Sequence, residues 1–283
     1  MKIIPLFSVV GLLAVLPLSL SAKIERVVEK TFMVTSPGTL RIETEGGSIR
    51  VQPSSDSMVK ITAKQKIRAN SDAEADEKLK KLTLTFAAEG ADVSAVAKLD
   101  RPAMGIRWGS NPIVVDFVVT VPAKFAANLK TSGGNIVVGD LEGRVDARTS
   151  GGDVKLGKIG GEIDASTSGG NVELAEGRAA VKLNTSGGNI VLDRVVGPAV
   201  VHTSGGNIRA SMVENTIAAK TSGGDVTATF VGALRGDCLL STSGGRVKAT
   251  VEPKTAFQLD ASTSGGGVEA AGFTITIEKG GVG

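Results

Sequence analysis

The sequence predicts an all-β fold: a parallel β-solenoid in which a single chain winds into coils of 18–21 residues, with a β-rich cap at its N-terminal end. Three observations predict it, namely a tetrapeptide at a nearly fixed period, alternating apolar residues between its copies, and few aromatic side chains. The chain has 283 residues with 37 glycines, eight phenylalanines, one tryptophan and no tyrosine. Its glycine content is nearly twice the usual value of about 7 %.

The tetrapeptide Thr-Ser-Gly-Gly occurs eight times from residue 131 onward. Successive copies start 18 residues apart as far as the sixth, and the last two follow at intervals of 21. Such self-similarity is typical of a solenoid, in which each repeat forms one coil and covers its neighbour. The copies begin at Thr131, Thr149, Thr167, Thr185, Thr203, Thr221, Thr242 and Thr263.

Apolar residues alternate with variable ones after each tetrapeptide. With the threonine as position 1, positions 6 and 8 are apolar in every repeat and position 7 is mixed. Positions 15 and 17 repeat the alternation in the first five repeats. A period of two indicates half-buried strands. Each repeat is therefore expected to hold two short strands, with Ile190, for example, pointing inward and Val191 outward.

The residues of the motif have structural interpretations. The glycine pair is expected to supply positive φ where the chain turns sharply. The threonine is expected at the inner rim, where its hydroxyl satisfies the turn backbone. Position 5 is Asn or Asp in six repeats, and such a column can hydrogen-bond along the stack and to turn amides. This column consists of Asn135, Asp153, Asn171, Asn189, Asn207 and Asp225.

Residues 1–22 are expected to be a secretory signal peptide. Lys2 precedes an apolar run, which ends in the small residues Ser21 and Ala22. This pattern is typical of a signal peptide cleaved near Ala22. An uncleaved anchor helix is the alternative, since about 18 apolar residues can just span a bilayer. After cleavage no segment of spanning length is left, so the protein is expected to be exported, periplasmic or extracellular, and not membrane-spanning.

Residues 23–124 are expected to form an N-terminal β-rich region. Residues 40–51 fit the repeat frame, with Glu in place of Ser in Thr-Glu-Gly-Gly, and predict a degenerate first coil. Residues 52–124 are interpreted as a cap that protects the N-terminal end of the stack from edge pairing. Residues 125–283 are expected to be the solenoid with its eight coils, closed by the differently alternating segment 273–277.

Three elements are expected inside the cap. Residues 59–63 alternate as a strand. Residues 71–81 form a short charged helix or loop, with Ser71 as a candidate N-cap. Residues 113–121 form a long apolar strand ended by Pro122.

Charge and composition exclude several classes of protein. The 32 basic and 29 acidic side chains nearly cancel, which disfavours a nucleic-acid partner. The single cysteine, Cys238, allows no intramolecular disulfide and lies in an alternating apolar stretch, so a buried core thiol is expected. The single histidine excludes a multi-histidine metal centre. This residue, His202, takes an outward strand position and is interpreted as a surface residue.

The chemistry of known β-helical sites is missing. Calcium β-rolls need Gly-Gly-x-Gly-x-Asp in each half-turn, and Asp140 takes that offset only once. Glycan-cleaving β-helices need paired carboxylates or a carboxylate–Arg/Lys cluster in a groove. The outward charges here change from coil to coil, as in Asp146, Arg148, Lys155, Asp164, Glu173 and Lys182. The sequence therefore predicts no catalytic residue, no cofactor, no metal and no enzymatic activity.

Three motifs and the signal peptide together carry a resemblance. The motifs are the repeated Thr-Ser-Gly-Gly-Asn/Asp-Ile/Val, the segment IVVDFVVTVP at 113–122 and TEGGSIRV at 44–51. On these residues the chain resembles a bacterial exported β-strand-repeat family of unknown function that carries an adhesin label. It is similar in turn to the head domain of auto-transporter adhesins. The resemblance covers residues 32–277 and implies the fold and the absence of known catalytic residues.

Two functional hypotheses follow. The first is a non-catalytic, adhesin-like interaction or scaffold module of the bacterial cell envelope, whose partner is an envelope protein or a glycan. The alternative is a carbohydrate-active enzyme or glycan-binding protein with its site in the cap at 101–111. There Trp108 lies beside Arg107 and could stack on a sugar ring, or it could pack the cap on the first coil. The solenoid edges also leave a homodimer open.

Overall fold

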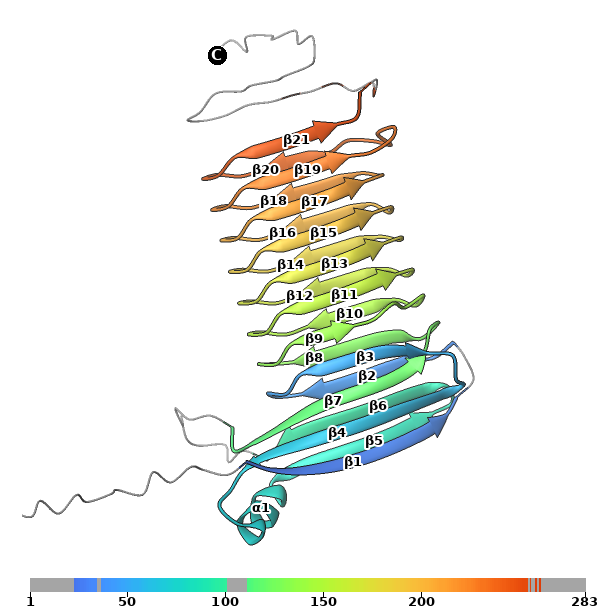
Figure 1. Ribbon diagram of the computed structural model, residues 1–283, viewed down its shortest axis with the longest axis vertical. Coiled ribbons are helices and arrows are strands. Elements are labelled where there is room, and N and C mark those ends of the chain that lie inside the picture. The colour runs from blue at the N-terminus through green and yellow to red at the C-terminus, as the bar shows by residue number, and fades with distance from the viewer. Residues whose placement is uncertain are drawn as a thin grey trace, which may run out of the picture.

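The computed structural model describes residues 23–34, 37–100, 111–253, 255, 258 and 260. The expected signal peptide, Trp108, the last Thr-Ser-Gly-Gly copy and segment 273–277 lie outside these residues. The described chain is nearly all β, with 21 strands in two facing sheets and one helix, α1 (Asp72–Leu79) (Figure 1). It contains no helix that is long and apolar enough to cross a membrane.

The larger sheet, sheet A, has eleven strands. In spatial order they are β1 (Lys23–Met33), β4 (Met58–Arg68), β7 (Ile113–Pro122), β3 (Ile49–Ser54), β9 (Ile136–Val138), β11 (Val154–Ile159), β13 (Val172–Gly177), β15 (Ile190–Val195), β17 (Ile208–Val213), β19 (Val226–Phe230) and β21 (Val247–Val251).

The second sheet, sheet B, has ten strands. In spatial order they are β20 (Leu239–Ser241), β18 (Ile217–Lys220), β16 (Ala199–His202), β14 (Val181–Asn184), β12 (Ile163–Ser166), β10 (Val145–Arg148), β8 (Ala126–Thr131), β2 (Thr39–Thr44), β6 (Asp92–Leu99) and β5 (Leu82–Glu89).

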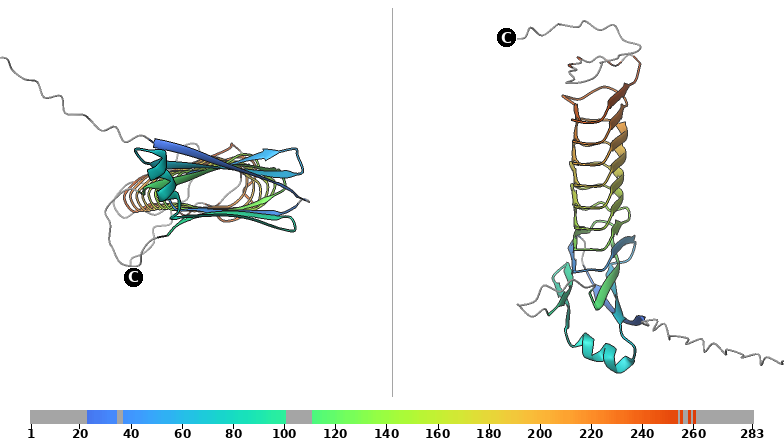
Figure 2. Two further views of the ribbon diagram at one scale, coloured as in Figure 1. Left: turned by 90° about the horizontal axis from the view of Figure 1, so that it is seen from below. Right: turned by 90° about the vertical axis from the view of Figure 1, so that its left-hand side faces the viewer.

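Each repeat contributes one strand to each sheet, and equivalent residues pair without slippage through most of the stack. Val172 pairs in parallel with Val154 on one side and with Ile190 on the other. Each coil therefore covers the next at about 4.8 Å, which gives the flattened rod of Figure 2. The predicted parallel β-solenoid is confirmed.

The thin interior is filled by the apolar columns of the repeat. Ile190 is 0 % exposed, whereas Val191 is half-buried on the outer face. This confirms the predicted inward and outward phase of the strand. Full burial of such aliphatic side chains stabilises a fold by about 1.5–3 kcal/mol each.

The first coil precedes the Thr-Ser-Gly-Gly repeats. Strand β2 pairs in parallel with β8, and β3 pairs in parallel with β9, with Ile49 opposite Ile136. This pairing agrees with the degenerate coil expected from Thr-Glu-Gly-Gly.

Beyond this coil the pairing changes from parallel to antiparallel. Strand β7 is parallel to β3 but antiparallel to β4, which is antiparallel to β1. In sheet B, β6 is parallel to β2 and antiparallel to β5. The edge strand β1 was not expected from the sequence. Its exposed Lys23, Glu25 and Lys30 are typical of an edge protected against further pairing.

Helix α1 lies at the end of the molecule beyond the antiparallel strands (Figure 1). The Ser71 hydroxyl oxygen accepts a hydrogen bond from the Glu74 amide at 3.2 Å, which confirms the predicted N-cap. The helix buries Ala75 and leaves its charged residues largely outside the core.

The positive φ expected at the repeat glycines is wrong. Among the described glycines only Gly90 and Gly232 have positive φ, at 61° and 72°. The second glycine of the motif is needed because successive turns touch. A Cβ on Gly188 would lie 1.9 Å from the carbonyl oxygen of Gly170, the equivalent glycine one coil earlier. On Gly187 a Cβ would meet nothing nearer than 3.5 Å.

The expected burial of Cys238 in the core is also wrong, because the thiol is half-buried. Cys238 lies in the turn between β19 and β20, which the three additional residues of this repeat lengthen. Its Sγ lies 3.9 Å from the carbonyl oxygen of Asn215 and packs at the rim of the core.

Candidate functional site

The threonine of the motif links adjacent coils from inside the turn. Thr203 Oγ1 donates to the carbonyl oxygen of Gly188 at 2.8 Å and accepts from the Gly206 amide at 3.3 Å. Thr203 is 0 % exposed, so water cannot easily replace either bond. The predicted role of the threonine hydroxyl is confirmed.

The Asn/Asp column forms the expected ladder, on the exposed side of the same turn. Asn171 Oδ1 accepts from the amide of Asn189, and Asn189 Oδ1 accepts from the amide of Asn207, both at 2.8 Å. The ladder continues to Asp225, which accepts from the Arg246 amide at 2.7 Å. Each of these side-chain oxygens therefore accepts a hydrogen bond from the next coil.

Two residues that the sequence analysis missed begin this ladder. Ser48 Oγ accepts from the Asn135 amide at 3.3 Å, and Asp116 Oδ1 accepts from the Ser48 amide at 2.7 Å. Asp116 directly precedes the buried Phe117, just as Asn135 precedes Ile136. That order of residues was the signal that could have identified Asp116.

Charged residues at the opposite turn neutralise one another. Arg178 Nε donates to Glu176 Oε1 at 2.6 Å, and Arg194 pairs with Glu214 at 2.7 Å. The hydrogen bond from Arg178 lowers the pKa of Glu176, with further lowering by the charges of Arg178, Arg194 and Lys158, while burial opposes it. A carboxyl held ionised in this way is unsuited to act as a general acid.

The remaining candidates from the sequence also have structural positions. Asp140 Oδ1 accepts from the Lys158 amide at 2.8 Å. His202 is half-buried on the outer face of sheet B, in register with Asn184 and Lys220. Within the described part of the chain, no three His, Cys, Asp or Glu side chains group in a way that could hold a metal ion.

Several outward charges of the coils are paired across strands. Arg148 contacts Asp146 at 2.7 Å and Asp164 at 3.1 Å on sheet B. On sheet A, Lys155 lies 2.9 Å from Glu173, whose hydrogen bond and charge raise the pKa of Lys155. In these pairs the basic side chains are exposed and the acidic ones are partly covered or exposed, and such surface pairs contribute little to stability.

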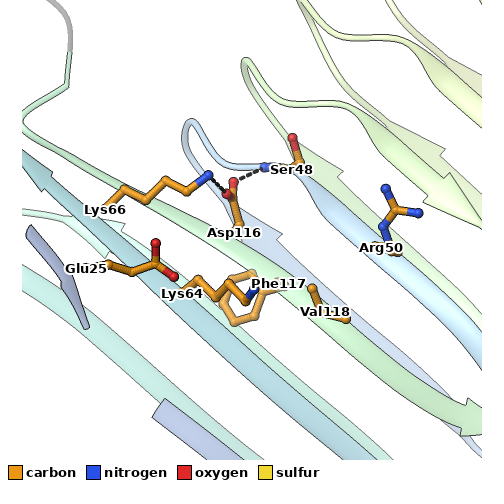
Figure 3. A pocket seen from close by; sticks show the side chains of 8 residues that line it. All are labelled: Glu25, Ser48, Arg50, Lys64, Lys66, Asp116, Phe117 and Val118. Carbon is orange, nitrogen blue, oxygen red and sulfur yellow. Dashed lines mark hydrogen bonds and ion pairs between the residues drawn. The ribbon is translucent and has the colours of Figure 1, made fainter. Parts of the chain in front are cut away.

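A polar hollow of about 310 Å³ lies on the outer face of sheet A, where the antiparallel strands meet the first coil (Figure 3). Lys66 Nζ lies 2.6 Å from Asp116 Oδ2, and the hydrogen bond and charge of Asp116 raise the pKa of Lys66. Arg50 stands apart from this pair in Figure 3. The lining residues are Glu25, Ser48, Arg50, Lys64, Lys66, Asp116, Phe117 and Val118.

No pattern in the sequence indicates this hollow. Except for Ser48, its residues come from β1, β3, β4 and β7, and no sequence repeat indicates how these strands pair. Glu25 and Val118 are 93 residues apart in the chain. The expected site around Trp108 lies outside the described residues, apart from Asn111.

The family model for Toastrack DUF4097 matches residues 38–279. The chain belongs to this family. The Toastrack match takes in the first coil and all eight copies of the tetrapeptide, and it confirms the resemblance to a β-strand-repeat family. No curated protein matches the chain.

Solved structures with similar folds are distant in sequence. An adhesin candidate from Bacteroides fragilis is 13 % identical, with a TM-score of 0.48 over 80 % of this chain and 95 % of that one. Another from Parabacteroides distasonis is 12 % identical, with a TM-score of 0.37 over 79 % of this chain and 97 % of that one. A cell-adhesion protein candidate from Clostridium sporogenes is 10 % identical, with a TM-score of 0.27 over 80 % and 100 %.

Proposed function

We propose that the protein is a non-catalytic, adhesin-like interaction module of the bacterial cell envelope. The observation that supports this proposal is that the turns and the outer faces of each coil have different roles. The motif residues of the turns hydrogen-bond to neighbouring coils, as Thr203 and Asn189 do. The outer faces of the two sheets are left as open, regular surfaces.

The outer face of sheet A shows what such a surface offers. Arg50 and Lys155 are in register with Val137, which lies between them. The same row continues from Glu173 through Val191 to Arg209. Side chains that repeat at about 4.8 Å along a straight rod suit an extended partner better than a small molecule.

Export is part of the proposal and is supported by the signal-peptide pattern of residues 1–22. Sequencing the N-terminus of the protein recovered from a bacterial host tests it. We expect the mature chain to begin at Lys23 and to be recovered from the periplasm or the medium. An intact N-terminus in the cytoplasmic fraction would contradict export.

The binding role is tested with the mature chain and isolated envelope fractions. Arg209→Glu reverses a charge on sheet A, and Lys182→Glu makes the matched change on sheet B. We expect saturable binding to one fraction, weakened at least tenfold by one of the two variants at unchanged melting temperature. Absence of saturable binding, or release of reducing sugar ends from a polysaccharide fraction, would contradict a non-catalytic binding module.

A further inference from the structure

We propose that the hollow on the outer face of sheet A binds a carboxylate group of an acidic polysaccharide, which lies across the strands and over Arg50. This inference rests on the proposed binding role and names the ligand chemistry of one surface. It is carried by two cations of the hollow, Arg50 and Lys64, which form no ion pair with another described residue, and by Asp116, whose two oxygens both have partners.

Asp116, one of the two acids of the hollow, has a partner at each of its oxygens. One oxygen of Asp116 accepts from the Ser48 amide at 2.7 Å, and the other lies 2.6 Å from Lys66 Nζ. Figure 3 shows both partners converging on this carboxylate. Asp116 is therefore fixed by the first step of the ladder and by Lys66. Glu25 also acts on Lys66, since its charge helps to raise the pKa of that lysine.

Arg50 and Lys64 are the cations of the hollow that remain open to a ligand. Neither forms an ion pair with another described residue, although Lys64 lies opposite Asp116 in the register of β4 and β7. Arg50 is exposed and is flanked in register by Val118 and Val137. With three cations and two carboxylates, the lining carries a net charge of +1. That charge matches a single carboxylate.

The side chain of Arg50 suits this ligand. A guanidinium group binds a carboxylate through two parallel N–H···O hydrogen bonds. The apolar residues beside Arg50 bring no competing acceptor. The Ser48 hydroxyl and Lys64 lie in the same hollow and can donate to further oxygens.

The row beyond the hollow favours a polymer. Arg209 follows Lys155 three strands later, and Arg209 also has no ion-pair partner among the described residues. At about 4.8 Å per strand, Arg50 and Lys155 lie about 10 Å apart, and Lys155 and Arg209 about 14 Å. Lys155 is paired with Glu173, so a chain with a carboxylate on every sugar would meet the two unpaired arginines, Arg50 and Arg209, about 24 Å apart. The interface with a folded protein usually has large apolar side chains at its centre. The only apolar side chains in this row are half-buried valines.

The test compares two arginines of the first coil. Arg50 lies on the outer face of sheet A, and Arg41 of β2 lies on the outer face of sheet B. Both are exposed, and neither forms an ion pair with another described residue. Binding of the mature wild-type, Arg50→Ala and Arg41→Ala proteins is measured by calorimetry. The ligands are a homogeneous oligogalacturonate, its methyl ester, and an oligoglutamate of equal charge.

We expect the oligogalacturonate to bind the wild type and Arg41→Ala alike, and Arg50→Ala at least tenfold more weakly at equal melting temperature. The methyl ester should not bind. No binding of the oligogalacturonate, or equal loss in both variants, would overturn the proposal. Equal affinity for oligoglutamate would overturn the choice of a saccharide. If the envelope fraction still binds in these cases, the proposed function stands without this site.

Discussion

The amide nitrogen of Asn189 lies 2.8 Å from the side-chain oxygen of Asn171 and donates a hydrogen bond to it from the next coil. Asp153 accepts from the amide of Asn171 in the same way at 2.7 Å. The position thus requires an acceptor oxygen and no particular charge. This explains why both Asn and Asp occur in the column.

Replacing Asn189 with Ala removes the acceptor for the Asn207 amide. We expect the free energy of unfolding to fall by about 1 kcal/mol, because the site is exposed and water partly replaces the lost bond. Asn189→Asp keeps the acceptor and should be nearly neutral. Urea denaturation of the two variants measures the difference, and equal losses would contradict a ladder based on the side-chain oxygen.

The two glycines of one motif should respond differently to alanine. Gly188→Ala places a Cβ against the Gly170 carbonyl and should destabilise the protein by about 1–3 kcal/mol or more. Gly187→Ala has room and restricts the unfolded chain, so it should be neutral or slightly stabilising. Thermal melts of both variants check this, and the reverse order would show that close stacking is not the reason for the glycine.

Neighbouring positions of β15 should differ strongly in their tolerance of a carboxylate. Ile190→Asp places an unpaired charge in the core and should cost about 4 kcal/mol or more, or prevent folding. Val191→Asp points outward between Glu173 and Arg209 and should change stability by less than about 1 kcal/mol. Circular dichroism melts that showed equal losses would contradict the strand phase.

Glu176 should make stability depend on pH. Its pKa in the folded protein is lowered from 4.5, first by the hydrogen bond from Arg178. Such a carboxyl stabilises the fold above its unfolded pKa, and this contribution is lost as the pH falls through the folded pKa. Glu176→Gln should therefore melt below the wild type at pH 7, with a difference that shrinks below pH 4.5.

The exposed Glu89, the last residue of β5, provides the control for this change. Glu89→Gln should leave the melting temperature unchanged across the same pH range. A difference between Glu176→Gln and the wild type that grew at acidic pH would contradict the assigned direction.

The sequence predicted the coils well because each position of the repeat can be compared among many copies. Alternation placed Ile190 inward and Val191 outward, and the hydroxyl of Thr203 bonds to the turn backbone as expected. The explanation for the glycines was wrong because glycine meets two different needs, positive φ and close approach. The structure separates the two needs, because Gly188 does not have positive φ and a Cβ on it would collide with the Gly170 carbonyl.

The polar hollow could not be predicted because its lining residues do not belong to the Thr-Ser-Gly-Gly repeats. Asp116 meets Ser48 across 68 residues, and Lys66 reaches Asp116 through the antiparallel pairing of β4 and β7. A single sequence holds no periodic signal for such contacts. The half-buried Cys238 was misplaced for a related reason, since the longer turn before β20 interrupts the period on which the prediction depended.

We infer that the Thr-Ser-Gly-Gly motif holds the coils together and is not a ligand site. The free energy of unfolding of Thr203→Val tests this inference, with Thr203→Ser as its matched control. The valine has the shape of threonine but leaves the Gly188 carbonyl and the Gly206 amide unpaired. We predict a loss of about 1–3 kcal/mol for valine and less than half of that for serine. A valine variant as stable as the wild type would contradict the account.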